Sequence, residues 1–436
     1  MKKRLFKKTI LLNLCLALFS SSGHTQNYFV SALTGSDRND GLTINKPFAT
    51  INKGGVLVNP GDTVFVMNGT YHSSNGPVLE FAKSGTEDQY ITFKAYPGHN
   101  PKITAWDNVW NAIHIIGSYV VIDGFELKGN NANINYAQAF QSYQEYMNGG
   151  RNWSSIANFN TNGITIGQTS SAHNVIIRNC RIHHFPGGGI NAIQADYITI
   201  ENNIVYNNSW YCMYANSGIS ILHPYNSDSS TGHKIIIRNN ISYNNKTTVP
   251  WHISEELSDG NGIIIDVNQF PANQPYIGRT LVENNISFNN GGSGIHAFRA
   301  DHVDIINNTA YNNGTMVGYQ EIFANSCNDV NILNNIMYAR AGGKVNSNYN
   351  NTNVTYDYNI YYNGPADVTG PEDIIADPQF VNPSTDPQEA DFFLHPTSPA
   401  RNSGSLVPGQ YSLTDINGVS RPNGIRPDRG AYEFEY

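Results

Sequence analysis

Short runs in which every second residue is apolar recur along most of the chain. Such an alternation has a period of two and predicts β-strands with one buried face. Most of these runs are followed by asparagines and a second short apolar stretch. The repeated segments are IIRNCRIHH (176–184), TIENNIVYNN (199–208), IIRNNISYNN (236–245), LVENNISFNN (281–290), IINNTAYNN (305–313) and ILNNIMYAR (332–340). Each unit is too thin to bury its own apolar face, so the pattern predicts units that stack on one another.

The spacing of these units indicates a basic period with insertions. Taking Asn179, Asn202, Asn239, Asn284, Asn307 and Asn334 as equivalent gives steps of 23, 37, 45, 23 and 27 residues. A further strand follows a glycine in five units: NGITIG (162–167), GGINAI (188–193), SGISIL (217–222), NGIIID (261–266) and SGIHAF (293–298). We call these the Gly-led strands. Asparagine tolerates the left-handed backbone that a tight turn requires, so strand, Asn turn, strand and Gly turn predict an all-β parallel β-helix.

The two ends of the repeat region differ from it. Residues 47–75 predict a short amphipathic helix followed by the first strands, and we expect this helix to cover the exposed end of the rod. From about Gly364 the sequence is irregular, which predicts a C-terminal closing segment at 364–436. We therefore expect a single domain over residues 27–436, with coils from about residue 60 to 363.

The composition agrees with an exported, all-β protein. Only 14% of the residues are charged, while glycine and tyrosine are abundant, and this mixture disfavours long helices. Residues 1–26 carry five basic residues, then an apolar run from Ile10 to Phe19, then small and polar residues, which predicts a secretory signal and a secreted or periplasmic protein. No later stretch approaches the roughly 20 apolar residues of a membrane span, so we expect no membrane association.

The charge balance argues against a nucleic-acid partner. The chain has 26 basic and 34 acidic residues, and removal of the five basic residues of the signal leaves 21 against 34, a net charge of -13. Three cysteines then remain, Cys180, Cys212 and Cys327, an odd number that does not suit a disulfide framework.

Three parts of the sequence carry a family resemblance. YFVSALTGSDRNDGL with KPFATI and NPGDTVFVMNGTY near the N-terminus, the Asn-rich coils, and DRGAYEF at the C-terminus resemble secreted right-handed parallel β-helix proteins of the pectate-lyase-like superfamily. The resemblance covers nearly the whole mature chain and implies a right-handed β-helix. It leaves the chemistry open, because that superfamily includes uronate lyases, glycoside hydrolases, epimerases and non-catalytic proteins. The paired Asp-Asp with Gly-His-Gly of polygalacturonases is absent.

Three insertions precede Gly-led strands, at 129–160, 207–216 and 246–258. Insertions of a solenoid gather on one face, so we expect these three to wall a carbohydrate groove. They are rich in aromatic residues, among them Tyr143, Tyr146, Trp153, Trp210, Tyr211, Tyr214 and Trp251. Such rings suit stacking on sugars, although they equally suit packing of the loops onto the rod.

Alignment of the Gly-led strands on their glycine predicts two outward columns. The first contains Thr165, Asn191, Ser220, Ile264 and His296, and the second contains Gly167, Ile193, Leu222, Asp266 and Phe298. We expect Asn191, Ser220, Asp266 and His296 to form one patch, with His223, Tyr225 and Arg299 at the strand ends. Each has a structural alternative: Asp259 and Asp266 could shape turns, and His296 could be an ordinary surface or loop-packed histidine.

The patch suits β-elimination from a uronic acid, which requires a base, an acid and a group that binds the carboxylate. The predicted catalytic residues are His296, Asp266, His223 and Tyr225. The predicted substrate-binding residues are Asn191, Arg299, Arg279, Asp259, Trp210, Tyr211 and Trp251. A glycosidic leaving group would make the protein a polysaccharide lyase, and a hydroxyl would make it an oligosaccharide dehydratase.

Two other functions stay open at this point. Asp259, Asp266, Glu255 and Glu256 could supply the paired carboxylates of a glycoside hydrolase. The same oxygens suit Ca²⁺, although no metal-loop spacing accompanies them. A non-catalytic glycan-binding or adhesion protein would need only the aromatic walls. In each case we expect a monomer whose partner is an oligo- or polysaccharide.

Overall fold

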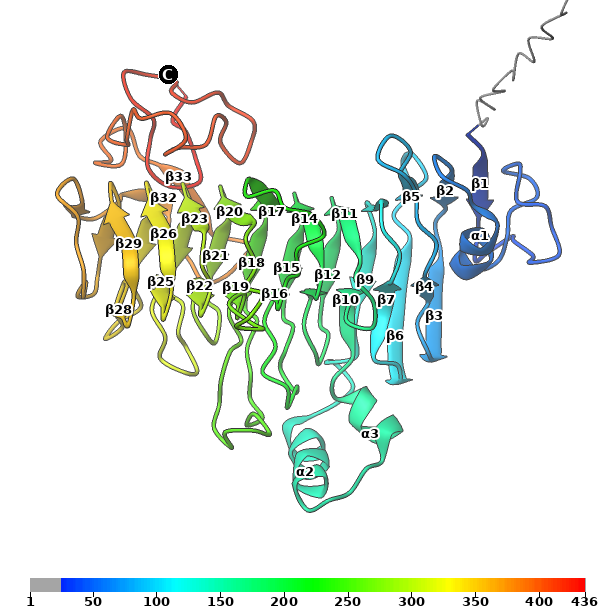
Figure 1. Ribbon diagram of the computed structural model, residues 1–436. Helices are drawn as coiled ribbons and strands as arrows, with labels where there is room; N and C mark the ends of the chain where they lie inside the picture. Colours follow the sequence, from blue (N-terminus) through cyan, green and yellow to red (C-terminus); the bar gives the residue numbers. More distant parts are fainter. Residues whose placement is uncertain (1–24, 436) are drawn as a thin grey trace, which may run out of the picture.

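The computed structural model describes residues 25–435, and the predicted signal at residues 1–26 lies almost wholly outside this range. Three long parallel sheets wind around one elongated core, as Figure 1 shows. Each regular coil contributes one strand to each sheet, so neighbours in a sheet come from successive coils. The prediction of an all-β parallel β-helix is therefore confirmed.

Two of the sheets contain eleven strands each. Sheet A consists of β1 (Asn27–Val30), β2 (Thr63–Val66), β5 (Ile91–Ala95), β8 (Val120–Asp123), β11 (His173–Arg178), β14 (Asp196–Glu201), β17 (His233–Arg238), β20 (Arg279–Glu283), β23 (Val303–Ile306), β26 (Asn328–Leu333) and β29 (Thr352–Asp357). Sheet B consists of β3 (Thr70–Asn75), β6 (Lys102–Asn108), β9 (Glu126–Lys128), β12 (Arg181–His183), β15 (Ile204–Tyr206), β18 (Ile241–Tyr243), β21 (Ile286–Phe288), β24 (Thr309–Tyr311), β27 (Ile336–Tyr338), β30 (Ile360–Tyr362) and β31 (Ile374–Ile375).

Sheet C contains the Gly-led strands. Its nine strands are β4 (Leu79–Phe81), β7 (Asn111–Ile115), β10 (Asn162–Gly167), β13 (Ile190–Ile193), β16 (Ile219–Leu222), β19 (Ile263–Asp266), β22 (Ile295–Phe298), β25 (Ile322–Asn325) and β28 (Asn348–Tyr349). The two remaining strands, β32 (Phe380–Asn382) and β33 (Asp391–Leu394), form an antiparallel pair. The Gly-led segments therefore lie side by side in one sheet, as their common pattern predicts.

The asparagines between sheets A and B explain why this residue recurs. Asn179, Asn202, Asn239, Asn284, Asn307 and Asn334 all have φ between 53° and 57°, a left-handed conformation that asparagine tolerates. The asparagine that follows each of the later turns is fully buried and hydrogen-bonds to its equivalent in the next coil. For example, Asn240 donates its backbone N–H to the Oδ1 of Asn285 at 2.9 Å, and Asn285 donates to Asn308 at 2.9 Å. Stacked amides thus satisfy one another inside the turn.

The N-terminal end of the core is covered by α1 (Ile51–Leu57), as predicted. Thr50 caps this helix by accepting a hydrogen bond from the N–H of Lys53 at 3.2 Å. Gly54 lies against Val64, and Gly55 lies against Phe81 and Phe93, so two glycines allow the helix to approach the core closely.

The C-terminal segment packs along the side of the rod. Phe380, Phe392 and Leu394 pack against the outward residues of sheet B, including Phe288 and Ile336. A cavity of about 500 Å³ lies between β15, β18 and β21 on one side and residues 387–393 on the other. Ala366 and Val368 pack against the main core cluster, as expected of a closing segment. Most of the C-terminal segment instead covers sheet B.

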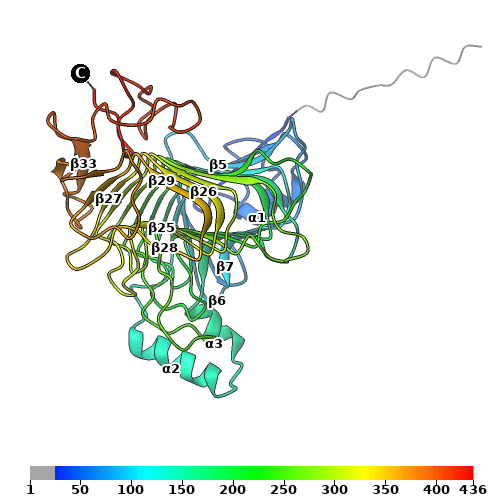
Figure 2. The same ribbon diagram turned by 60° about the vertical axis from the view of Figure 1, so that its left-hand side comes forward.

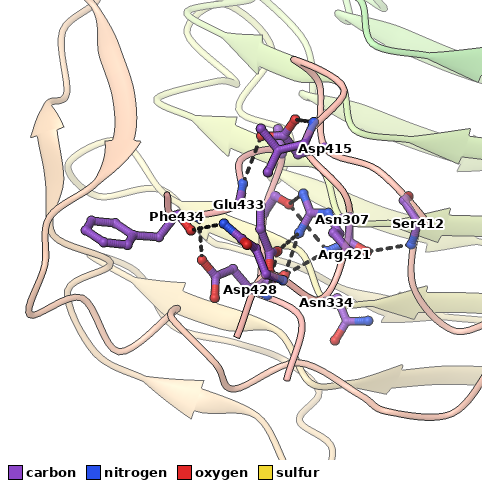
Figure 3. Close-up of polar contacts among 12 residues, drawn as sticks. Asn307, Asn334, Ser412, Asp415, Arg421, Asp428, Glu433 and Phe434 are labelled. Carbon is purple, nitrogen blue, oxygen red and sulfur yellow. Dashed lines mark hydrogen bonds and ion pairs between the residues drawn. The ribbon is translucent and has the colours of Figure 1, made fainter. Parts of the chain in front are cut away.

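Buried polar contacts anchor this segment to the coils (Figure 3). The guanidinium of Arg421 is fully buried and pairs with Glu433 at 3.2 Å. It also donates to the carbonyl oxygens of Asp428 at 2.7 Å and Gly430 at 2.9 Å. The turn residue Asn307 donates to the carbonyl of Asp428 at 3.0 Å, which ties the segment to the rod.

The first insertion forms a lobe that projects from the rod, and Figure 2 shows it from a second direction. It contains α2 (Tyr136–Met147) and α3 (Trp153–Asn158). Neither of these helices, nor α1, is long and apolar enough to cross a membrane, and they are the α-helices of residues 25–435. Cys180, Cys212 and Cys327 are free and buried.

Candidate active site

All three predicted insertions lie at the same corner of the β-helix. Each connects a strand of sheet B to a strand of sheet C: β9 to β10, β15 to β16, and β18 to β19. Their aromatic side chains mostly pack on one another. Tyr143, Met213 and Val249, one from each insertion, belong to one buried cluster, and Tyr211 packs against it.

The two tryptophans predicted to bind substrate differ in their contacts. The indole N–H of half-buried Trp210 donates to the carbonyl of Asn244 at 3.0 Å. Trp251 is half-buried, and its backbone N–H donates to the carbonyl of Glu256 within the same insertion at 2.8 Å. The contacts of Trp210 and Tyr211 agree with the packing alternative, whereas the hydrogen bond of Trp251 involves its backbone and leaves its ring as a predicted substrate contact.

The register of sheet C produces both predicted columns. Thr165 pairs with Asn191, Asn191 with Ser220, Ser220 with Ile264, and Ile264 with His296. Asn191 and His296 are therefore three strand spacings apart, about 14 Å at the usual spacing of about 4.8 Å. The expectation of one patch containing both is wrong for this reason. Asp266, by contrast, lies on β19, directly beside β22, which carries His296.

Asp266 and Asp259 form the acidic part of the site. Burial raises the pKa of Asp266 to about 7, the negative charge of Asp259 adds to this, and Arg299 acts in the opposite direction. Burial likewise raises the pKa of Asp259 to about 6. The carboxylate of Asp259 accepts hydrogen bonds from Ser258 at 2.8 Å and from the side chain of Asn261 at 3.0 Å. Two carboxyl groups with raised pKa values thus lie near β19, Asp259 in the turn before the strand and Asp266 at its end.

His296 is buried without a hydrogen-bond partner. His296 is 6% exposed, and neither Nδ1 nor Nε2 has a hydrogen-bond partner among the described residues. The imidazole stacks on Phe323 with ring centroids 4.0 Å apart, and Tyr319 lies at 5.8 Å. Burial lowers the pKa of His296 to about 3, so the ring is neutral at pH 7. A buried imidazole without a hydrogen-bond partner costs free energy, and such groups recur at functional sites.

Two residues near this cluster were not identified from the sequence. Burial raises the pKa of Tyr319, a contact with Ser258 lowers it, and the charges of Asp259 and Asp266 raise it, so Tyr319 lies within electrostatic reach of both carboxyls. Lys246 is half-buried at the start of the third insertion, and desolvation lowers its pKa. Tyr319 lies outside every Gly-led strand and outside the three long insertions, so the column alignment could not find it.

The end of β22 supplies a positive charge. Arg299 is exposed, its guanidinium lies 5.2 Å from the ring of Phe298, and it forms no ion pair within residues 25–435. His223 occupies the equivalent turn after β16, where its backbone N–H donates to the carbonyl of Asp266 at 3.2 Å. Burial lowers the pKa of His223, and its ring lies 5.0 Å from Phe270. Both residues therefore border Asp266.

Two predicted site residues lie elsewhere. The hydroxyl of Tyr225 donates to the carbonyl of Ser171 at 2.8 Å, which directs this side chain toward the turn between β10 and β11 and away from Asp266. Arg279 begins β20 in sheet A and pairs with Asp304 at 2.6 Å and with Asp329 at 2.8 Å. Its guanidinium is thus used in a structural network on another face, so its assignment to substrate binding is corrected.

Residues 25–435 contain no group of three or more His, Cys, Asp or Glu side chains arranged to hold a metal ion. The cluster formed by Asp259, Asp266, His296 and Arg299 has groups that can transfer protons and bind an anion. We call these four residues the Asp266 cluster.

Comparison with known proteins supports the fold assignment. Pectate lyase L of Thermoclostridium stercorarium is 26% identical over 271 residues, which cover 59% of this chain and 20% of that protein. The uncharacterized protein YwoF of Bacillus subtilis (strain 168) is 36% identical over 86 residues, which cover 20% of this chain and 17% of that protein. The chain thus spans about a fifth of the length of these relatives.

The crystal structure of pectate lyase Pel9A has a TM-score of 0.55 at 19% identity, and the match covers 94% of this chain and 97% of that one. The predicted resemblance to pectate-lyase-like β-helix proteins is confirmed. A family model described as "Pel9A-like, right handed beta helix region" matches residues 28–348, and the chain belongs to this family.

Proposed function

We propose that the protein is a carbon–oxygen lyase that performs β-elimination on uronate-containing oligo- or polysaccharides. The observation that carries this proposal is the buried, neutral imidazole of His296, whose two nitrogens have no partner within residues 25–435. Beside it lie a carboxyl group with a pKa of about 7 and an unpaired guanidinium. The 26% identity to a protein named pectate lyase L points in the same direction. The predicted signal sequence would place this activity outside the cytoplasm.

Each member of the Asp266 cluster has a role in this reaction. Arg299 binds the carboxylate of the uronate, which stabilises the negative charge that develops next to C5. His296 removes the proton from C5, and Asp266 in its protonated form donates a proton to the departing oxygen at C4. Burial keeps Asp266 protonated near neutral pH, and the negative charge of Asp259 adds to this effect.

The step is balanced in protons and electrons. The C5–H electron pair becomes the C4–C5 double bond while the C4–O bond breaks and its electrons leave with the oxygen. His296 finishes as imidazolium and Asp266 as carboxylate, and exchange with solvent restores both. If the departing oxygen belongs to a glycosidic bond the polymer is cleaved, and if it belongs to a hydroxyl the product is water.

The test is incubation of the protein with a panel of uronate glycans. Ultraviolet absorbance of the unsaturated ring and the release of reducing ends are followed together. Both rising together indicates a lyase, and absorbance alone indicates a dehydratase. Replacement of His296 by alanine should lower turnover by about 10²–10⁴-fold, the usual contribution of a general base. Absence of turnover with every glycan, together with retained glycan binding, would favour a binding protein.

Glycoside hydrolysis is the second candidate, and the interaction between Asp259 and Asp266 favours it. Both pKa values are raised, and a carboxyl pair in which one member stays protonated is the arrangement that glycosidases use. Reducing ends without new ultraviolet absorbance would identify this reaction. Under hydrolysis, Asp259→Asn should abolish turnover, because the second carboxylate acts directly on the sugar or on water.

A further inference from the structure

The asparagines at the corner between sheets B and C form a hydrogen-bonded ladder. Each of Asn208, Asn245 and Asn290 donates its backbone N–H and its side-chain amide to the Oδ1 of the next ladder asparagine, at 2.9–3.1 Å. Asn313 is the last of them. Its N–H donates to Oε1 of Glu321 at 2.9 Å, and its Nδ2 donates to Oε2 of the same residue at 2.6 Å. A buried carboxyl group therefore takes the place of the next asparagine.

The register shows that two positions depart from the repeat at this end of the asparagine ladder. Because Ile295 pairs with Ile322, Glu321 occupies the position that is Gly294 in the preceding coil. The same position is glycine in the earlier coils, at Gly262, Gly218 and Gly189. A Cβ on any of these glycines would lie 2.6–3.0 Å from a ladder amide nitrogen. The pairing of Tyr311 with Tyr338 places Arg340 where the next ladder asparagine would stand.

In this coil Glu321 stands where other coils have glycine, and Arg340 stands where they have asparagine. These two differences change how loop 314–320 is held. The contact between Asn313 and Glu321 joins the two residues that flank the loop. The guanidinium of Arg340 lies inside the loop, where Nε donates to the carbonyl of Gly314 at 2.9 Å. The N–H of Gly314 donates in turn to Gly292 in the neighbouring coil at 2.6 Å.

Tyr319, near the end of loop 314–320, lies over the Asp266 cluster. The ring centroid of Tyr319 is 5.8 Å from that of His296, and its phenol lies close enough to Ser258, Asp259 and Asp266 to interact with them. Together with Phe323 at 4.0 Å and Phe298 at 5.7 Å, it encloses the unpaired imidazole. The position of this loop therefore affects how accessible His296 is.

We propose that Tyr319 is a further residue of the active site, closing over His296, and that Glu321 and Arg340 are positioning residues that replace a ladder rung in order to hold Tyr319 there. The catalytic part of this inference rests on the proposed lyase activity. The positioning part concerns only the order of loop 314–320 and the accessibility of His296.

The first test uses Glu321→Gln, with Asp373→Asn as its matched control. Asp373 ends the other asparagine ladder, where it accepts the N–H of Asn359 at 2.7 Å. Both amides put an NH₂ group where the carboxyl accepted a hydrogen bond, so both should lower the Tm by a few degrees. Only Glu321→Gln should speed hydrogen exchange in loop 314–320 and the acylation of His296 by diethyl pyrocarbonate, mapped by mass spectrometry. Equal behaviour of the two variants would overturn the positioning role.

The second test rebuilds the regular rung with the double variant Glu321→Gly/Arg340→Asn. This pair restores the residues found in the other coils, so the Tm should return toward that of the wild type. Loop 314–320 should stay mobile, and kcat should stay about tenfold or more below the wild-type value with a smaller change in KM, because misplacement of an active-site group costs rate. Recovery of kcat together with Tm would show that Glu321 only supports the ladder.

The third test asks whether Glu321 acts through Tyr319. Glu321→Gln should lower kcat in the wild-type background and have no further effect in a Tyr319→Ala background, since residues that act as a unit are not additive. Additive losses would overturn the inference. Absence of turnover in the wild-type protein with every glycan would instead refute the proposed function, and the exchange and acylation measurements would still decide the positioning role.

Discussion

Arg279 and Asp304 form a two-point ion pair between neighbouring strands of sheet A. Nε of Arg279 lies 2.6 Å from Oδ2 of Asp304, and a terminal nitrogen lies 2.8 Å from Oδ1. Asp304 also contacts His233 at 2.8 Å and Asn331 at 2.7 Å. Hydrogen bonds from these groups hold the pKa of the Asp304 carboxyl well below its usual range despite its burial.

This pair predicts a stability effect with no effect on catalysis. Arg279→Gln leaves the buried carboxylate of Asp304 without its main partner, so unfolding by denaturant should show a loss of about 3 kcal/mol. Arg238→Gln is the control. Its guanidinium also pairs with a carboxylate of sheet A, Glu201 at 2.8 Å, but is 42% exposed, so the loss should be about 0.5 kcal/mol. If Arg279→Gln remains folded but has a lower kcat/KM, Arg279 belongs to the active site after all.

Arg421 should determine whether the C-terminal segment stays on sheet B. Arg421→Met removes a buried positive charge and leaves Glu433, whose carboxylate is 1% exposed, without its ion-pair partner. We expect a loss of about 3–5 kcal/mol. Limited proteolysis should then cleave the segment, residues 364–436, before the coils. Arg426→Met, which removes the contact of Nε with the carbonyl of Gly404 at 2.8 Å, should leave the cleavage pattern unchanged.

Much of the fold could be predicted because its signals are local and repeated. Alternating apolar residues, the turn asparagines and the Gly-led strands each have one physical cause, and together they fix the order of the sheets and the register of Thr165, Asn191, Ser220, Ile264 and His296. The location of the C-terminal segment could not be predicted in this way. It depends on long-range contacts such as Asn307 with Asp428, which are 121 residues apart.

The site was only partly predictable for a related reason. Alignment of the Gly-led strands predicts which residues follow one another along the sheet. It does not show that two members of a column, Asn191 and His296, are too far apart to form one patch. The direction of Tyr225 and the partners of Arg279 depend on loops that have no repeat. Tyr319 was missed because its loop is short, and the signal that points to it is the departure of Glu321 and Arg340 from the glycine and asparagine of other coils.

Arg299 is expected to act mainly on substrate binding. Its guanidinium has no carboxylate partner within the described chain, so a uronate can bind there without displacing an existing pair. Arg299→Ala should raise KM by about ten- to hundredfold, the equivalent of one charge-assisted contact, with a smaller change in kcat. Arg238→Gln should leave KM unchanged. Equal affinity of the variant for charged and neutral oligosaccharides, where the wild type prefers charged ones, would confirm the role.

The pH dependence of turnover follows from two groups with opposite requirements. His296 must be neutral, and with its pKa lowered to about 3 it is neutral over the whole working range. Asp266 must be protonated, and its pKa of about 7 means that protonation is lost as the pH rises through 7. The charged or titratable groups around it are Asp259, Arg299, Tyr319 and His223. Turnover should therefore be constant between about pH 4 and 6 and fall above about pH 7, the reverse of an enzyme whose histidine base must lose a proton near neutrality.

Asp259→Asn should move this decline to lower pH. The negative charge of Asp259 helps to raise the pKa of Asp266, so its removal lets Asp266 lose its proton earlier, and kcat at pH 7 should fall while kcat at pH 5 changes little. Glu255→Gln removes one negative charge from the exposed part of insertion 246–258, four residues before Asp259, and should leave the profile in place, because solvent screens that charge. A shift of the same size in both variants would mean that net charge and not the buried pair sets the profile. Loss of turnover at every pH in Asp259→Asn would point to hydrolysis, in which Asp259 acts on the substrate itself.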